Sequence, residues 1–209
     1  QAEINYPGPT AVTENEEVCV GETATLSATP AAGTTLRWYD AETGGTLLAS
    51  GNSFTTPALT PAGIKTYYIA VVRGGCEDPV RIPVNVTVNP RATATDIQAT
   101  GDTICEGDSF TLSATSSTVT NPIFRFYTSQ DLTTEITDLT VSPATTTTYY
   151  VTVSGDGVCE NAPGDAAEVT VTVNPSATAT DIQAMGDTIC EGDSFTLSAT
   201  SSTVTNPIF

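Results

Sequence analysis

The sequence predicts an all-β protein made of tandem antiparallel β-sandwich units that lie end to end. Three observations lead to this prediction. Threonine, which suits a pleated and half-exposed surface, accounts for 41 of the 209 residues. Apolar residues alternate with polar ones along several short segments, whereas no apolar stripe has helical spacing. Long stretches of sequence also recur further along the chain.

The recurring stretches set the domain organisation. Residues 92–124 recur at residues 177–209 with one difference, Met185 in place of Thr100. Such close identity, surface positions included, is typical of recent tandem duplication, so we expect the sequence to be part of a longer array. The expected units are residues 1–90, residues 91–175, and residues 176–209 as the truncated start of a third.

Within the two complete units the same strand signals appear in the same order. In unit one they cover residues 24–28, 36–39, 66–72 and 84–88, and in unit two residues 110–114, 124–127, 148–154 and 169–173. Turn residues separate these segments, and each alternates so that one face is apolar. About seven short strands in a unit of about 85 residues are typical of an immunoglobulin-like sandwich of two antiparallel sheets.

Short linkers join the units. Residues 89–91 read Asn-Pro-Arg and residues 174–176 read Asn-Pro-Ser. Proline fixes one backbone dihedral and stiffens a connection. We therefore expect successive units to form a semi-stiff rod.

The five cysteines are expected to form structural disulfides within units. The pairs would be Cys19 with Cys76 and Cys105 with Cys159. In each pair one cysteine precedes the second strand and the other follows the sixth, positions taken to share one end of a sandwich. Cys190 then lacks a partner because its unit is truncated. Disulfides indicate an oxidising compartment, so an extracellular, cell-surface location is expected.

Composition excludes several classes of function. The chain carries 24 acidic against 6 basic residues, a formal net charge of −18, which disfavours nucleic acid and anionic lipid surfaces as partners. The sequence has no histidine, the commonest general base and metal ligand. No apolar run is long enough to span a membrane. We expect no enzyme activity and no membrane insertion.

Several short motifs carry a family resemblance. In unit one they are Cys19–Ala28 (Cys-x-Gly-x-x-x-Thr-Leu-x-Ala), Arg37–Asp40, Thr43–Gly45, Phe54–Pro57, Thr66–Tyr68 and Gly75-Cys76. Unit two keeps Arg125–Tyr127 and Thr148–Tyr150 but lacks the Gly-Gly and Thr-Thr-Pro motifs. On these motifs the chain resembles the Ig-like repeat common in secreted proteins of Bacteroidetes. The resemblance implies stalk repeats of large surface adhesins, gliding adhesins among them, or accessory modules of secreted hydrolases, many exported by the type IX secretion system.

Three functions are open on this basis. The first is a spacer in a cell-surface adhesin or filament, with neighbouring repeats as partners and a distal tip for surface glycans or other cells. Near-identical copies favour it, because a spacer selects for the number of units. The second is a carbohydrate-binding module, with the exposed half of Trp38-Tyr39 stacking on a sugar ring. The third is a fibre assembled by strand exchange through the incomplete unit.

Two kinds of site remain as candidates. Asp102, Glu106 and Asp108 lie close together at a unit junction, where carboxylates could bind calcium; no other cofactor is expected. The resemblance to Bacteroidetes proteins also implies O-glycans on Asp-Ser/Thr followed by a small or aliphatic residue. Thr103 and Thr188 fit this pattern, each between an aspartate and an isoleucine.

Overall fold

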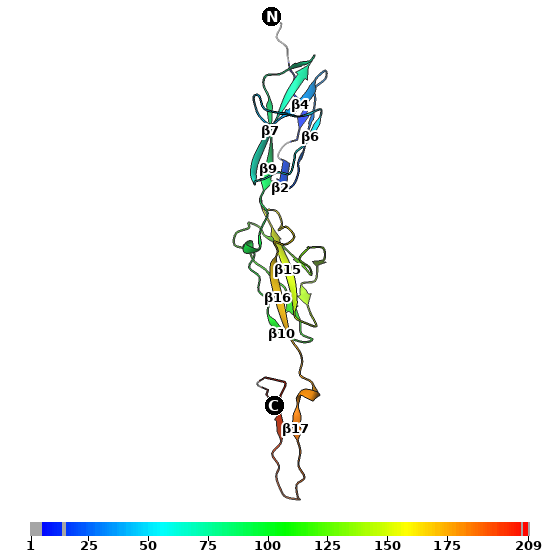
Figure 1. Ribbon diagram of the computed structural model, residues 1–209, viewed down its shortest axis with the longest axis vertical. Coiled ribbons are helices and arrows are strands. Elements are labelled where there is room, and N and C mark those ends of the chain that lie inside the picture. The colour runs from blue at the N-terminus through cyan, green and yellow to red at the C-terminus, as the bar shows by residue number, and fades with distance from the viewer. Residues whose placement is uncertain (1–5, 14–15, 206, 209) are drawn as a thin grey trace.

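The chain forms an elongated row of β-rich units in a computed structural model, which describes residues 6–13, 16–205 and 207–208 (Figure 1). Unit one lies at the N-terminal end, unit two follows it, and the third partial unit lies beyond. The expected limits at Gln1 and Phe209 fall outside the described residues. The all-β class and the end-to-end arrangement of immunoglobulin-like units are confirmed.

Unit one is a sandwich of two sheets. Its strands are β1 (Ala11–Val12), β2 (Glu16–Cys19), β3 (Thr25–Thr29), β4 (Thr35–Tyr39), β5 (Leu47–Ser50), β6 (Ser53–Thr55), β7 (Gly63–Arg73), β8 (Cys76–Glu77) and β9 (Ile82–Asn89). The larger sheet has the order β2-β9-β7-β4-β5, with β8 paired to β7, and the smaller sheet has the order β1-β3-β6.

The core of unit one follows from the alternating sequence. β3 buries its apolar residues and exposes the polar ones between them, and β9 buries Val84, Val86 and Val88 in the same way. Trp38 of β4 is fully buried among these side chains, and its indole N–H donates to the Gly51 carbonyl oxygen at 3.0 Å. The buried indole N–H of Trp38 therefore has a hydrogen-bond partner.

Unit two repeats the arrangement with shorter edge strands. Its elements are the 3₁₀ turn η1 (Ala94–Asp96) and strands β10 (Thr103–Cys105), β11 (Phe110–Thr111), β12 (Ile123–Tyr127), β13 (Glu135–Ile136), β14 (Thr140–Val141), β15 (Thr147–Ser154) and β16 (Ala167–Asn174). One sheet has the order β10-β16-β15-β12-β13, and β11 pairs with β14 on the other side.

One strand pair in each large sheet is parallel, against the expectation of purely antiparallel sheets. β2 runs parallel to β9, and β10 runs parallel to β16. In unit one the chain begins on the small sheet with β1 and crosses to the edge of the large sheet before it turns back into β3. This crossing brings Cys19 beside Asn89 and Cys105 beside Asn174. Both cysteines thus lie at the C-terminal end of their unit, where the last strand stops.

The third partial unit contains η2 (Ala179–Asp181), β17 (Gln183–Met185) and β18 (Ser198–Thr200), and its two strands form a hairpin. Its sequence is almost that of the start of unit two, yet Leu197 is 84% exposed where Leu112 is 1% exposed. In unit two the sheet containing β12, β15 and β16 covers this leucine, and the described part of the third unit has no such sheet. Among the described residues, no helix is long and apolar enough to cross a membrane.

Candidate functional site at the junction between units

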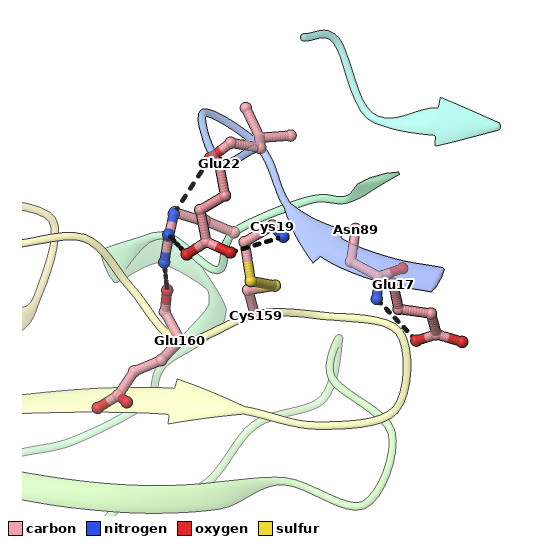
Figure 2. The surroundings of a disulfide bond; sticks show 8 residues. Glu17, Cys19, Glu22, Asn89, Cys159 and Glu160 are labelled. Carbon is pink, nitrogen blue, oxygen red and sulfur yellow. Dashed lines mark hydrogen bonds and ion pairs between the residues drawn. A yellow bond between two sulfur atoms is a disulfide. The ribbon is translucent and has the colours of Figure 1, made fainter. Parts of the chain in front are cut away.

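A disulfide joins the two complete units. Cys19 ends β2 of unit one, and Cys159 lies in the loop between β15 and β16 of unit two. Their Cα atoms are 5.9 Å apart although the residues are separated by 140 positions in the sequence. Figure 2 shows the bond beside the linker that connects the units. The junction therefore has two covalent connections, the peptide chain and the disulfide.

The expected pairing of Cys19 with Cys76 and of Cys105 with Cys159 is wrong. Cys76 and Cys105 are free and exposed, as is Cys190. β2 runs parallel to β9, whereas β7 runs antiparallel to it, so the turn after β7 that carries Cys76 lies beyond the start of β9. The two cysteines of a unit thus lie at opposite ends of the sandwich. A disulfide between them would need Cα atoms within about 7 Å.

Main-chain hydrogen bonds hold Cys159 against the linker. Its N–H donates to the Pro90 carbonyl oxygen at 2.8 Å, and its own carbonyl oxygen accepts from the N–H of Ala92, also at 2.8 Å. These bonds form a short parallel bridge between Arg91 and Cys159. The linker is therefore paired with unit two like a short strand, which fixes the point where unit two begins.

Arg91 ties the same linker to both units. Its Nη2 donates to the Glu22 carboxylate of unit one at 2.6 Å, and its Nη1 donates to the Glu160 carbonyl oxygen of unit two at 3.2 Å. Its Nε donates to the Val20 carbonyl oxygen at 3.4 Å. The Glu22 carboxylate also accepts from the Cys19 N–H at 3.1 Å (Figure 2). The guanidinium fork thus connects the residue next to one half of the disulfide with the residue next to the other.

Glu160 anchors the loop that presents Cys159. Its carboxylate accepts from Thr152 at 2.6 Å, from Tyr127 at 2.9 Å and from Arg125 at 2.7 Å. Burial raises the pKa of Glu160, but the hydrogen bonds from Thr152 and Tyr127 and the charge of Arg125 outweigh it, so the pKa lies below its usual value. The carboxylate therefore fixes the loop to β12 and β15 while it is ionised.

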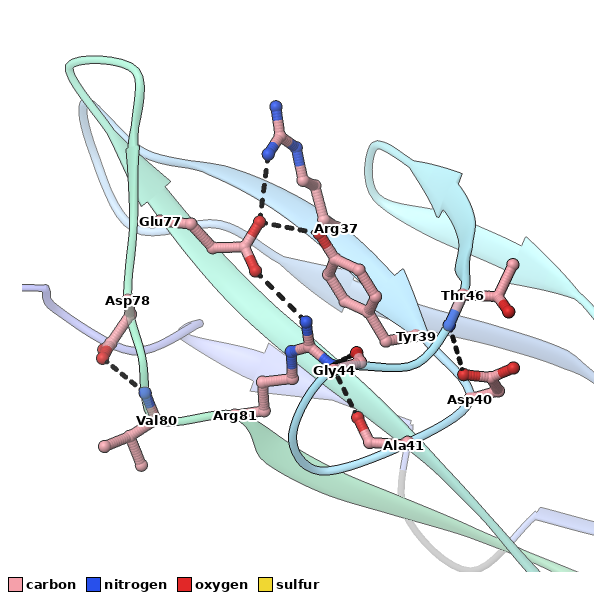
Figure 3. Close-up of polar contacts among 10 residues, drawn as sticks. All are labelled: Arg37, Tyr39, Asp40, Ala41, Gly44, Thr46, Glu77, Asp78, Val80 and Arg81. Carbon is pink, nitrogen blue, oxygen red and sulfur yellow. Dashed lines mark hydrogen bonds and ion pairs between the residues drawn. The ribbon is translucent and has the colours of Figure 1, made fainter.

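The matching end of unit one has the same construction (Figure 3). Glu77, directly after Cys76, accepts from Tyr39 at 2.7 Å and from Arg37 at 3.0 Å. Arg81 adds a contact at 3.4 Å, and its guanidinium lies 3.4 Å from the centre of the Tyr39 ring. Burial again raises the pKa of Glu77, and the hydrogen bonds from Tyr39, Arg37 and Arg81 again lower it below its usual value.

Sequence reasoning missed the residues that fix the junction, Arg91, Glu22 and Glu160. A signal for the last was present, because a glutamate directly follows the second cysteine in both units. The Arg-x-Tyr motif of Arg125–Tyr127 supplies its partners, and the same motif occurs in unit one. As a sequence pattern the motif predicts only a strand, whereas in the structure its polar side chains also position the cysteine loop.

The carboxylates considered for calcium are used separately. Asp102 accepts from the Thr103 N–H at 2.7 Å, Asp108 from the Cys105 N–H at 3.3 Å, and Glu106 from the Ser176 N–H at 3.3 Å. Within the described residues, no three acidic or cysteine side chains gather into a group that could hold a metal ion. The structure does not bring these carboxylates together into one site.

The threonines expected to carry glycans are both exposed. Thr103 begins β10 at the edge of the large sheet of unit two, and Thr188 lies in the corresponding segment of the third partial unit. Both have the same local geometry, since the N–H of each donates to the carboxylate of the preceding aspartate at 2.7 Å. Trp38 and Tyr39, in contrast, are 0% and 9% exposed, so this pair offers no face to a sugar ring.

Comparison with known families gives one match. Residues 7–90 and residues 92–175 each match the family described as "Ig-like domain CHU_C associated". No curated protein matches the chain.

Solved structures of tandem domains are also similar to the chain. The insect immune protein hemolin is 13% identical with a TM-score of 0.39, over 83% of this chain and 48% of hemolin, so the chain spans about half of hemolin's length. A chimeric titin Z1Z2 is 17% identical with a TM-score of 0.32, over 80% and 96%. The fibronectin(III)-like modules of Clostridium thermocellum CbhA are 16% identical with a TM-score of 0.37, over 79% and 95%. Similarity at this level carries no argument about function.

Proposed function

The chain belongs to the family of CHU_C-associated Ig-like domains, and on that premise we propose that its units are structural spacer repeats in the stalk of a large secreted cell-surface adhesin or filament. The stalk lifts a binding tip away from the cell, and the tip meets surface glycans or other cells. These units provide the stalk with length and stiffness and carry out no catalysis.

The disulfide between Cys19 and Cys159 is the observation that supports this role. Two bodies joined by one flexible peptide can bend in every direction. A second covalent connection leaves only rotation about the line through both connections. The hydrogen bonds of Arg91 to both units oppose that remaining rotation. A junction restrained in this way suits a spacer that must hold a distal tip at a fixed distance from the cell.

Charge and compartment support an extracellular site. A formal net charge of −18 keeps neighbouring stalks apart by repulsion and favours solubility. Disulfides persist in oxidising surroundings, and the disulfide between units needs such surroundings to form. Export by the type IX secretion system of Bacteroidetes belongs to the same proposal.

Exposed apolar residues of the third partial unit favour a second candidate function, strand exchange between molecules. Leu197 is 84% exposed and Met185 is 71% exposed. Exposed apolar side chains next to a free sheet edge are a template for a strand from another copy. Light scattering separates the two candidates, because strand exchange gives oligomers at micromolar concentration and a spacer of this length gives monomers.

The spacer function is tested by measuring how the units bend. Electron micrographs or X-ray scattering of the oxidised chain should give a narrow distribution of angles between unit one and unit two. The double variant Cys19→Ser, Cys159→Ser should give a broad distribution with both units folded. Cys76→Ser removes a cysteine far from the junction and serves as the matched control. Equal distributions for all three proteins would remove the support for a stiff spacer.

A further inference from the structure

The free cysteines Cys76 and Cys105 lie where the bonded cysteines lie in the neighbouring unit. Each complete unit has one cysteine at its C-terminal end, Cys19 or Cys105, and one at its N-terminal end, Cys76 or Cys159. The bridge in the structure joins the C-terminal end of one unit to the N-terminal end of the next. The two ends without a bridge are the N-terminal end of unit one, with Cys76, and the C-terminal end of unit two, with Cys105.

The surroundings of Cys105 share the strand pairing and two of the hydrogen bonds found around Cys19. Cys19 lies beside Asn89 in the parallel strand pair, and the next N–H donates to the Asn89 carbonyl oxygen at 2.9 Å. Cys105 lies beside Asn174, and the N–H of Glu106 donates to the Asn174 carbonyl oxygen, also at 2.9 Å.

A carboxylate three residues on closes the same turn in both places. Glu22 accepts from the Cys19 N–H, and Asp108 accepts from the Cys105 N–H. The thiol of Cys105 is therefore held at the C-terminal end of unit two as the sulfur of Cys19 is held in unit one.

A side chain of the second linker donates a hydrogen bond to unit two as a side chain of the first linker does to unit one. Arg91 donates to the carbonyl oxygen of Val20, the residue after Cys19. Ser176 donates through its hydroxyl to the carbonyl oxygen of Glu106, the residue after Cys105, at 3.3 Å. This contact is independent of the thiol and holds the start of the second linker beside the turn that follows Cys105.

The other half of such a bridge is built into the N-terminal end of each unit. Glu160 fixes the Cys159 loop to Tyr127 and Arg125, and Glu77 fixes the Cys76 turn to the equivalent pair, Tyr39 and Arg37. Unit one, whose cysteine at this end is free, thus shows the presentation of the cysteine without a bonded neighbour. The N-terminal end of a unit therefore has this arrangement before any disulfide forms there.

We propose that the C-terminal end of unit two is a docking and cross-linking site for the N-terminal end of a following Ig-like unit, with Cys105 bonded to the cysteine of that unit equivalent to Cys159. The same rule leaves Cys76 to bond a unit on the other side of unit one. An array of such units is cross-linked at every junction, and each unit is bridged to both neighbours. The inference rests on the proposed spacer function and names the partner of the free ends.

The bridge forms by oxidation of two thiols. Cys105 and the cysteine of the following unit lose two protons and two electrons as the S–S bond forms. A disulfide oxidant accepts them, so that one glutathione disulfide becomes two glutathione thiols. Thiolate of either cysteine attacks the oxidant first, and the second thiolate then displaces glutathione from the mixed disulfide.

A longer chain tests the proposal. A copy of residues 125–175 is added after Phe209, which completes the third unit because residues 177–209 repeat residues 92–124 but for one position. The protein is folded with glutathione disulfide, free thiols are alkylated, and the unreduced digest is analysed by mass spectrometry. We expect the peptide pair Cys19–Cys159 and a second pair joining Cys105 to the copied cysteine.

The first pair serves as an internal control for folding. If Cys19 is bonded to Cys159 but Cys105 is alkylated or bonded elsewhere, the proposal is wrong. If neither pair forms, the bridge from which the proposal is inferred is itself absent, and the proposal is again wrong. The matched variant Cys105→Ser should leave the copied cysteine alkylated and the first pair intact. The angle distribution between units one and two tests the spacer function separately, since it does not involve Cys105.

Discussion

Cys19 and Cys159 are bonded across the linker although 140 positions separate them. The bond encloses the chain from the end of β2 in unit one to the loop after β15 in unit two. A force applied at the two ends of the protein passes from Cys19 directly to Cys159. Most of both units is therefore shielded from the force while the bond is intact.

Reduction should lengthen the chain under force. Release of the enclosed segment, which spans 140 residue steps of about 3.5 Å each, adds about 490 Å of contour length. Single-molecule force spectroscopy with and without reductant measures this increment, and Cys76→Ser should leave it unchanged. An increment of about 190 Å, which bonding within a unit would give, contradicts the observed pairing.

The strands of the core could be predicted from the sequence because their burial is encoded locally. Alternation around Leu26 and along Val84, Val86 and Val88 identifies the inward face without knowledge of the neighbours. The edge strands could not be predicted in this way. β2 and β10 are short, and their parallel pairing depends on where the chain crosses between sheets.

The disulfide could not be predicted because it depends on strand direction. β2, which ends at Cys19, runs parallel to β9, whereas β7, which Cys76 follows, runs antiparallel to β9. Cys19 and Cys76 therefore lie at opposite ends of the sandwich and not at the shared end that the sequence predicts. When units are stacked head to tail, opposite ends of adjacent units meet, and Cys19 meets Cys159.

Arg91→Ser should loosen the first junction without unfolding either unit. The ion pair with Glu22 is partly exposed, with 32% and 49% of the side chains accessible, so its loss should cost at most about 1 kcal/mol. Serine is the natural residue at the equivalent position of the second linker, Ser176. We expect an unchanged melting temperature within a few degrees and a wider angle distribution after reduction. An unchanged distribution in the reduced variant would show that Arg91 does not restrain the junction.

Glu160 should make the stability of unit two depend on acid pH. Its pKa is lowered by folding, so its stabilising contribution is complete above the unfolded value of about 4.3 and is lost as the pH falls through the folded value. Neutralising the net charge of −18 acts in the opposite direction, because it relieves repulsion. A comparison of variants is therefore needed to separate the two effects.

The variant Glu160→Gln should be less stable than the wild type by about 1 to 3 kcal/mol at pH 7, because hydrogen bonds to a charged group are weakened. The difference should shrink as the pH falls below the unfolded value of about 4.3 and through the lower folded value, where the wild-type carboxyl becomes neutral. Denaturant titrations across this pH range measure it. Glu168→Gln, at an exposed position of β16, is the control. A difference that stays constant with pH contradicts the role of the ionised carboxylate.

Thr103 and Thr188 should carry O-glycans in protein from the native host. Both are exposed, and both follow an aspartate whose carboxylate accepts their N–H at 2.7 Å. Peptide mass spectrometry should find added hexose-containing mass on both residues. Thr172 is exposed on the neighbouring strand but follows a valine, so it should be unmodified. Unmodified peptides across Thr103 and Thr188 would disprove the assignment.

Leu112 and Leu197 provide a matched pair for measuring what the sheet of β12, β15 and β16 contributes to unit two. They occupy the same position in nearly identical sequence, so strand propensity and local turns are the same for both. Leu112 is 1% exposed in the core of unit two, and Leu197 is 84% exposed. Leu112→Ala should lower the free energy of unfolding of unit two by about 2 to 5 kcal/mol, through lost burial and the cavity left behind.

Leu197→Ala should change stability by less than about 0.5 kcal/mol when the chain is dilute, because an exposed side chain has little to lose. Guanidinium denaturation of both variants beside the wild type measures the two effects. Equal losses would mean that Leu197 is covered in solution. A loss for Leu197→Ala that grows with protein concentration is the result expected of strand exchange, since a second copy would then bury this leucine.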